Sequence, residues 1–202
     1  MNRRKNISIT LSIFILLAAG ISALSQGPQE RPIEQSYDVI LQVMIGGDKA
    51  QGQSIPQNLG AVARMLKANY SFTDYRLANT FVGRIANNGT FEFKSVSNIF
   101  GSNSESETPS FLELSISGLR SGSNQAGKTV LVLERFRFGA RIPIKTAVFS
   151  DGAKLAPVVN YESIGLTSAR VTLAENSPTL LGSLSLPAAD NSMFLVLTLR
   201  PA

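Results

Sequence analysis

The stretch Arg135–Thr167, RFRFGARIPIKTAVFSDGAKLAPVVNYESIGLT, carries the most regular pattern in this sequence of 202 residues. An alternating run leads into Gly139, a proline-centred unit follows at Ile142–Ile144, and a polar loop separates it from the run Val159–Leu166. Alternation of apolar and polar residues with a period of two is typical of a strand with one buried face. The stretch therefore predicts a β-rich fold.

Similar strand patterns occur on both sides of this stretch. The run Met193–Leu199 is almost continuously apolar, as expected of a central strand that is covered on both faces. The strands predicted from these patterns are Tyr37–Ile45, Tyr75–Ile85, Thr90–Val96, Phe111–Ser117, Thr129–Phe138, Arg170–Leu173, Thr179–Leu186 and Met193–Arg200.

One segment has a helical period instead. Between Ser54 and Tyr70, apolar residues recur at helical spacing, and Ser54 with Gln57 matches a capping box. The period predicts an amphipathic helix with Leu59, Val62, Ala63 and Leu66 on its buried face; the basic Arg64 and Lys67 on its outer side are either a contact face or an ordinary solvated surface.

A turn signal follows this helix and completes the predicted fold. Asn87-Asn88-Gly89 predicts a hairpin between strands 75–85 and 90–96, since these residues tolerate positive φ. The predicted fold class is α+β, mainly antiparallel β with one amphipathic helix. A strand-helix-hairpin half is followed by an all-β half.

The amino-terminal segment resembles an export signal. Basic residues at positions 3–5 precede an apolar run to Leu24, and small residues stand before a cleavage position after Ser25. This predicts a signal peptide at 1–25, a linker at 26–36 and a single domain at 37–202, with a sub-boundary at the polar loop 98–110 as an alternative. An uncleaved membrane anchor is the alternative for the first segment. The predicted location is the periplasm or cell envelope.

Composition excludes several chemistries. The chain has no Cys and no His, so it forms no disulfides, no Cys/His zinc sites and no Ser-His or Cys-His nucleophilic pairs. Of the 19 basic residues, three lie in the signal, which leaves 16 against 14 acidic residues and a small net charge of about +2. A nucleic-acid partner is therefore not expected.

Gly122–Thr129 matches the phosphate-loop pattern G-x-x-x-x-G-K-[ST]. Such a loop must open a helix, whose amino-terminal amides hold the phosphates. Here the alternating, β-branched run Val130–Phe136 follows instead. The segment is therefore interpreted as a hairpin loop, and we predict no nucleotide, other cofactor or metal.

The strand that follows this loop carries a candidate site. Its alternation places Val132, Phe136 and Phe138 on one side, and four cations on the other. These cations could contact an acidic protein surface or lipid headgroups; the alternative is a solubilising face balanced by Glu113 or Glu162. The candidate partner-binding residues are Arg135, Arg137, Arg141 and Lys145.

The same region resembles part of the secretin homology region of bacterial type II and III secretion channels. The similarity lies in Phe138–Ile144, Val159–Leu166 and Val171–Leu173, and it extends over about residues 135–200 through Thr179–Leu184 and Leu197–Pro201. The chain is too short for the ring-building domains and a complete channel, and Leu180–Ser183 has no paired glycine. The resemblance implies a secretin-like module or an exported relative.

These observations predict a non-enzymatic, exported envelope protein that acts by binding or assembly, with a protein partner or a second copy of itself. A periplasmic small-molecule carrier and a hydrolase of unknown type are the alternatives. The carrier would need an apolar pocket of several hundred cubic ångströms, and the hydrolase would need an acid or lysine with a strongly shifted pKa in a cleft.

Overall fold

The computed structural model describes residues 34–48, 53–97, 108–147, 149–150, 153–154, 157–186 and 190–202. Glu34–Ala202 forms one compact unit. The predicted signal peptide, all of the linker before Glu34, and residues 98–107 of the predicted sub-boundary lie outside the described residues.

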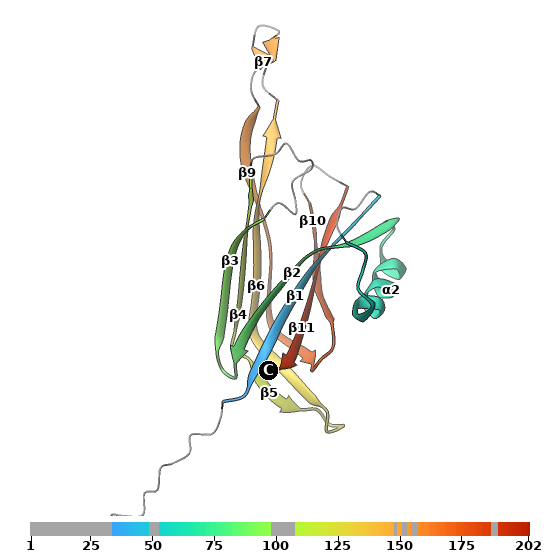
Figure 1. Cartoon of the computed structure of the whole chain (residues 1–202), viewed down its shortest axis with the longest axis vertical. Helices are drawn as coiled ribbons and strands as arrows, with labels where there is room; N and C mark the ends of the chain where they lie inside the picture. Colours follow the sequence, from blue (N-terminus) through green and yellow to red (C-terminus); the bar gives the residue numbers. More distant parts are fainter. Residues whose placement is uncertain are drawn as a thin grey trace, which may run out of the picture. The chain divides into compact units, whose positions relative to one another are not determined.

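Two antiparallel sheets make up most of this unit (Figure 1). Sheet A has the strand order β10-β11-β1-β2. Sheet B has the order β3-β4-β6-β9, with β5 paired to β6 beyond the end of β4. The short strands β7 and β8 pair with each other. The elements are β1 (Ser36–Gly47), η1 (Gln57–Leu59), α2 (Gly60–Asn69), β2 (Asp74–Ala86), β3 (Thr90–Ser97), β4 (Ser110–Ser117), β5 (Arg120–Ser123), β6 (Thr129–Thr146), β7 (Phe149–Ser150), β8 (Ala153–Lys154), β9 (Val158–Ala174), β10 (Thr179–Ser185) and β11 (Ser192–Pro201).

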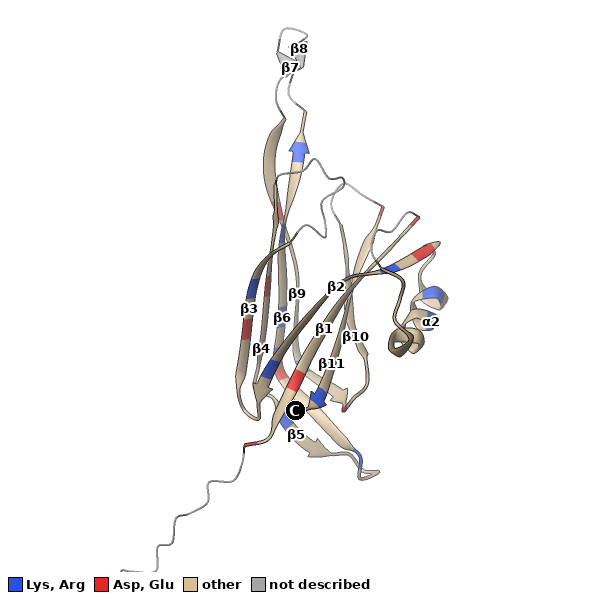
Figure 2. Cartoon of the chain, in the orientation of Figure 1, with Lys and Arg blue, Asp and Glu red and all other residues tan. Residues whose placement is uncertain are grey.

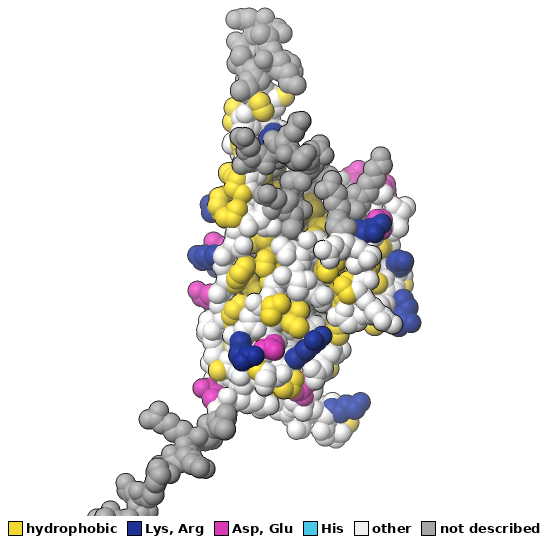
Figure 3. Space-filling model, in the orientation of Figure 1, with side chains coloured by type: hydrophobic (Ala, Val, Ile, Leu, Met, Phe, Trp, Pro, Cys, Tyr) yellow, Lys and Arg dark blue, Asp and Glu magenta, His cyan; other side chains and the backbone are white. Residues whose placement is uncertain are grey.

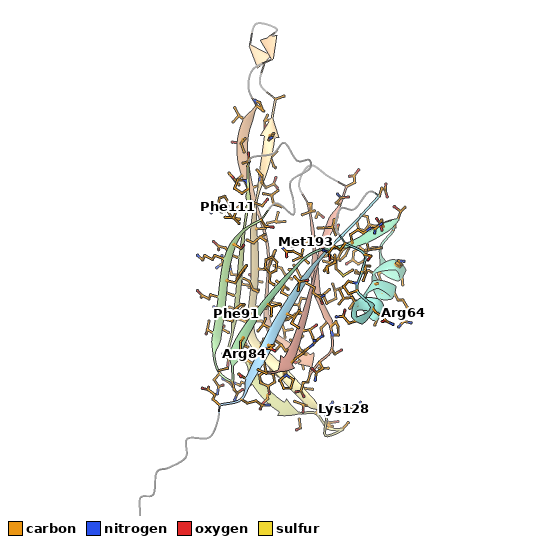
Figure 4. All side chains as sticks on the ribbon, in the orientation of Figure 1. Arg64, Arg84, Phe91, Phe111, Lys128 and Met193 are labelled. Atoms are coloured by element: carbon orange, nitrogen blue, oxygen red, sulfur yellow. The ribbon has the colours of Figure 1, made fainter. Side chains whose placement is uncertain are left out.

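The core lies between the two sheets. Alternate residues of β1, such as Val39 and Leu41, face alternate residues of β4 and β6, such as Leu114 and Phe138. Sheet-on-sheet packing of this kind defines a β-sandwich, and the predicted α+β, mainly antiparallel fold class is confirmed. Met193 lies between the sheets in this core (Figure 4).

The helix α2, which is the one α-helix among the described residues, covers the outer face of sheet A and forms a third layer (Figure 1). Leu59, Val62 and Leu66 are buried against Phe194 and Val196 of β11. Both faces of β11 are therefore covered, as its almost continuously apolar run predicted. The predicted capping box is wrong: the 3-10 turn starts at Gln57 after Pro56 and has no side-chain cap, so the helical segment begins two residues later than a cap at Ser54 predicts.

The end of α2 is attached to sheet A by an aromatic cluster. The hydroxyl of Tyr75 donates to the carbonyl oxygens of Leu66 (3.1 Å) and Tyr70 (3.2 Å). The ring of Phe194 packs edge-on against that of Tyr70, with centroids 4.8 Å apart. These contacts hold the last turn of the helix to β2 and β11.

Tyr75→Phe is expected to lower the free energy of unfolding by about 1 kcal/mol, in the middle of the range for the net contribution of a hydrogen bond. The cost is small because Leu66 O also accepts the backbone N–H of Tyr70 and is not left unpaired. Urea unfolding would measure it. Tyr161→Phe is the matched control: its hydroxyl also donates to a carbonyl, that of Pro109, but it is exposed and should change stability by less than about 0.5 kcal/mol.

The same hydroxyl gives a pH dependence. Burial, with a smaller contribution from Tyr70, raises the pKa of Tyr75 above its usual 10.0. The folded state therefore keeps this proton at pH values where the unfolded chain has lost it, so stability is full below pH 10 and falls as pH rises through the folded pKa. Tyr75→Phe should remove this part of the slope; an identical alkaline slope in both proteins would contradict the assignment.

The predicted hairpin between β2 and β3 is wrong. The turn itself forms, with Asn88 at φ 59° and the N–H of Gly89 bonded to Ala86 O. However, β2 pairs with β1 in sheet A and β3 pairs with β4 in sheet B. The turn is thus a corner that passes the chain from one sheet to the other (Figure 1).

Along the strands of sheet B, the set of alternate residues that faces the core switches at one position. Leu131 and Leu133 of β6 face the core, but beyond Glu134 it is Phe136 and Phe138 that do so. At matching positions on the neighbouring strands, Gly118 and Arg170 have positive φ angles of 66° and 54°. The predicted alternation is therefore wrong for Val132, because the irregularity at Glu134 turns it away from the side of Phe136 and Phe138.

The hairpin of β6 and β9 extends beyond the rest of sheet B. Pairing of β4 with β6 starts at Phe111 and Arg141, whereas β6 and β9 remain paired as far as Thr146 and Val158. We call the segments 142–146 and 158–162 the arm (Figure 1). The arm is a two-stranded ribbon. The sequence predicted a separate short strand at 170–173, but these residues form the end of the longer strand β9.

Candidate functional site

The four predicted partner-binding cations lie in one column on the outer face of β6. Arg135, Arg137, Arg141 and Lys145 are all exposed, and every second residue between Phe136 and Ile142 is buried on the opposite side. The first three lie on sheet B and Lys145 lies on the arm. We call these four residues the cation column. In Figure 2, a Lys or Arg residue (blue) marks β6 near its upper end, where this strand extends beyond the rest of sheet B.

Neither predicted acidic neighbour forms an ion pair with the cation column. Glu113 instead forms an ion pair with Lys94 on β3, and its Oε1 is 3.7 Å from Nζ of Lys94. Glu162 is directly opposite Ile142, whose side chain is buried, so Glu162 is on the other face of the hairpin. Across the part of the chain that the structure describes, the ion pairs involve Arg76, Arg84, Lys94 and Arg120 and leave the column without a carboxylate partner.

Aromatic side chains flank the upper part of the column. The guanidinium of Arg141 is 4.8 Å from the ring centroid of Phe111, a cation–π distance. Phe111 in turn contacts Tyr161 of β9, with centroids 5.6 Å apart, and Tyr161 donates to Pro109 O. Phe111 projects from the side of sheet B that faces away from sheet A (Figure 4).

Two of the exposed apolar residues of the arm lie on this same face. Val159 is opposite Lys145, and Tyr161 is opposite Pro143. Their exposed fractions are 36% and 42%, which is high for side chains of this kind. The outer face of the arm therefore combines cations with apolar and aromatic groups.

A groove of about 370 Å³ lies within the column, over Gly139 and Gly165. These glycines are directly opposite each other on β6 and β9, so the floor has no side chains. A Cβ on Gly139 would meet nothing within 4 Å, whereas one on Gly165 would come 2.8 Å from Phe138 O. Arg137 and Arg141 flank the groove, which we call the glycine hollow.

The lining of the glycine hollow bears on the alternative functions. Polar and apolar residues line it in similar measure, so it is not the predominantly apolar pocket that a carrier requires. The residues other than glycine are Glu113, Arg137, Arg141, Ser163, Thr167, Phe111, Phe138, Ala140 and Ile164. The hydrolase alternative stays a prediction. Among residues 34–48, 53–97, 108–147 and the later described segments, no three acidic side chains are grouped closely enough to hold a metal ion.

The phosphate-loop pattern lies at the turn from β5 to β6. Asn124 accepts the backbone N–H groups of Ala126 and Lys128 at 2.9 and 3.0 Å, and the chain enters β6 directly at Thr129. Lys128 projects from this turn (Figure 4). The hairpin-loop interpretation is confirmed.

Sequence reasoning found the cation column but not the glycine hollow. Isolated glycines at positions 139 and 165 were a signal, because glycine inside a strand often marks a bend or a close approach. Their opposition depends on the register of the β6–β9 hairpin, and so does the position of Tyr161 beside Pro143. Periodicity along one strand does not contain that information.

Comparisons with known proteins establish no family for this sandwich. No family model matches the chain, and no curated protein matches it. The cryo-EM structure of the Salmonella SPI-1 type III secretion injectisome secretin InvG is similar at 10% identity and a TM-score of 0.25, over 94% of this chain and 69% of that one. An atomic model of the basal body proteins InvG, PrgH and PrgK is similar at 10% identity and a TM-score of 0.25, over 94% of this chain and 49% of that one.

At this TM-score the similarity is compatible with a partial secretin-like resemblance and carries no argument about fold or function. Separately, none of the helices in the described residues has the length and apolar character needed to cross a membrane.

Proposed function

We propose that this chain is a non-enzymatic, exported protein of the bacterial cell envelope that acts by binding another protein chain or by assembly. The supporting observation is the cation column: four exposed cations without a carboxylate partner among the described residues, beside Val159 and Tyr161. Arginine and tyrosine are enriched at protein interfaces, where both combine apolar contact with hydrogen bonding. Export is supported by the amino-terminal sequence pattern.

The arm supports the same proposal. Because no third strand among the described residues pairs with it, both of its edges carry backbone groups that a partner strand could pair with. Ribbons of two strands are only marginally stable in water, so contact with another protein would stabilise it. The partner would therefore have acidic side chains opposite the column and an apolar surface opposite Val159 and Tyr161.

Reversal of the charges of the cation column should strongly weaken partner binding. The bait carries Arg135→Glu, Arg137→Glu, Arg141→Glu and Lys145→Glu, and we expect it to recover at least about tenfold less partner from envelope extracts than the unchanged protein, because like charges would face each other. Recovery by the unchanged protein should also fall as salt increases. Mass spectrometry would identify the partner.

A matched control has the same change in net charge elsewhere. Arg64, Lys67, Lys128 and Arg200 are exposed cations outside the column, and their replacement by glutamate should leave partner recovery within about twofold. Equal losses in both quadruple variants would show that net charge alone controls recovery, and the proposed role of the column would then be wrong.

A further inference from the structure

One row of residues across sheet B has an unusual composition. The registers align Lys94 of β3, Glu113 of β4, Gly139 of β6 and Gly165 of β9. All four positions lie on the outer face, because their neighbours Leu112, Leu114, Phe138 and Ala140 are buried on the other one. Two long charged side chains thus occupy one half of the row, and two residues without side chains occupy the other half.

The rows on either side place charges around this pattern. One aligns Phe111 with Arg141, and the other aligns Ser115 with Arg137. Because Arg137 and Arg141 are four residues apart, their Cα atoms are separated by roughly 13 Å along the strand, with Gly139 midway. A carboxylate above Gly139 would therefore have a guanidinium on each side.

We propose, building on the proposed function, that the partner on this face is a second copy of the chain. A two-fold axis parallel to the strands, between β4 and β6, exchanges the two halves of each row. It places Glu113 of each copy over the partner's Gly139, between the partner's Arg137 and the partner's Arg141. Lys94 then lies over the partner's Gly165, and Phe111 faces the partner's Arg141.

This arrangement makes the row of Lys94, Glu113, Gly139 and Gly165 self-complementary in shape, and it pairs Glu113 of each copy with the partner's Arg137 and the partner's Arg141. Long side chains of one copy meet the glycine hollow of the other, and each carboxylate meets two guanidiniums. An axis across the strands would instead superpose β6 on the partner's β6 and bring cations together, which costs several kcal/mol. Charges of both signs project along the side of sheet B in the space-filling view, at the left margin of Figure 3.

The existing contact of Glu113 does not prevent this use. Its ion pair with Lys94 is 3.7 Å long, and the two side chains are 51% and 75% exposed. A surface pair of this kind contributes at most about 1 kcal/mol, so Glu113 can exchange it for two guanidiniums.

The size of the face predicts a weak dimer. Four strands at about 4.8 Å spacing over roughly 23 Å of length give a flat area of about 440 Å², below the ~800 Å² per partner of a standard interface. Contacts from the arm would add to this area. We therefore expect a dimer that forms at high protein concentration.

A charge exchange tests the proposal. The protein purified after expression of the full chain is examined by sedimentation equilibrium over a wide concentration range. Glu113→Arg alone and the double variant Arg137→Glu with Arg141→Glu should each dimerise at least about tenfold more weakly than the unchanged protein. An equimolar mixture should form heterodimers, because Arg at 113 then faces glutamates and the remaining Glu113 faces the original arginines.

Two further variants separate the contact from general effects. Gly139→Leu fills the hollow where a side chain has room in the monomer, and it should block dimerisation without lowering the thermal midpoint. Lys128→Glu, on the β5–β6 turn, should leave dimerisation unchanged. Full dimerisation of Gly139→Leu, or a mixture that stays monomeric, would overturn the proposed arrangement.

The outcome is distinguishable from failure of the proposed function. A strictly monomeric unchanged protein whose recovery of an envelope protein still depends on the cation column would eliminate the second copy as partner and keep the binding function. If the unchanged protein is monomeric and its recovery of an envelope protein does not depend on the cation column, both the dimer and the proposed function are wrong.

Discussion

Phe194→Ala is expected to lower the free energy of unfolding by about 3–5 kcal/mol, the range observed when a buried phenylalanine is truncated. The side chain is fully buried between sheet A and the helix layer. Its ring contacts those of Tyr70, Phe72 and Tyr75 at centroid distances of 4.8, 6.3 and 5.9 Å. The loss is a large fraction of the roughly 5–15 kcal/mol that stabilises a typical domain.

The expected loss has a specific location. Gly46 lies directly beneath the ring, where a Cβ would come 2.9 Å from Phe194, so the site is tightly packed and cannot collapse easily around a cavity. Urea unfolding gives the magnitude, and a loss of near-ultraviolet tyrosine signal before the main transition would indicate that α2 detaches first. Val82→Ala on the same sheet is the control, because Val82 is 68% exposed and should change stability by less than about 0.5 kcal/mol.

Gly118→Val is expected to cost about 2–3 kcal/mol, the second largest effect. Gly118 has a φ of 66°, which is strained for a β-branched residue, and its added side chain would meet Glu134. Because Glu134 is at the position where β6 changes its buried side, the substitution disturbs sheet B where the parity changes.

Two other glycines separate the causes of this loss. Gly127 also has positive φ, 72°, but a Cβ there meets nothing within 4 Å, so Gly127→Val should show the backbone cost alone, about 1–2 kcal/mol. Gly122 is free of both constraints, and Gly122→Val should be nearly neutral. Equal losses at all three positions would contradict the assignment of strain to Gly118.

The parts of the fold that sequence reasoning predicted depend on local patterns. Alternation located most strands, and the almost continuously apolar run 193–199 correctly indicated that β11 is covered on both faces. Helical spacing identified the buried side of α2 at Leu59, Val62 and Leu66. Each of these signals depends on residues within a few positions of one another.

The errors concern the choice of partner strands. Asn88 forms the turn that its sequence predicted, but a turn signal does not determine whether the flanking strands pair. The ring of Phe91 occupies the space that a Cβ on Gly83 would need, at 2.3 Å, so β3 packs against β2 as the chain passes between sheets. No local pattern predicts this contact. No local pattern predicts the switch at Glu134 in which alternate residues of β6 face the core, either.

The candidate site divides in the same way. Alternation along one strand predicted that the four cations share a face, and the structure places them there. The row across sheet B takes one residue from each of four strands, namely Lys94, Glu113, Gly139 and Gly165. It can therefore be recognised only when the registers of three strand pairs are known.

The position of β11 has a consequence for how the chain reaches its folded state. β1 is flanked by β2, which follows it closely in sequence, and by β11, which includes residue 201. The first strand of sheet A therefore keeps one open edge until almost all of the described chain has been synthesised and, if it is exported, has passed through the membrane. Closing so long a loop makes folding slow, since contacts between distant residues form late. Until β11 pairs with it, β1 has an edge of unpaired backbone N–H and C=O groups, and such an edge can pair with another extended chain.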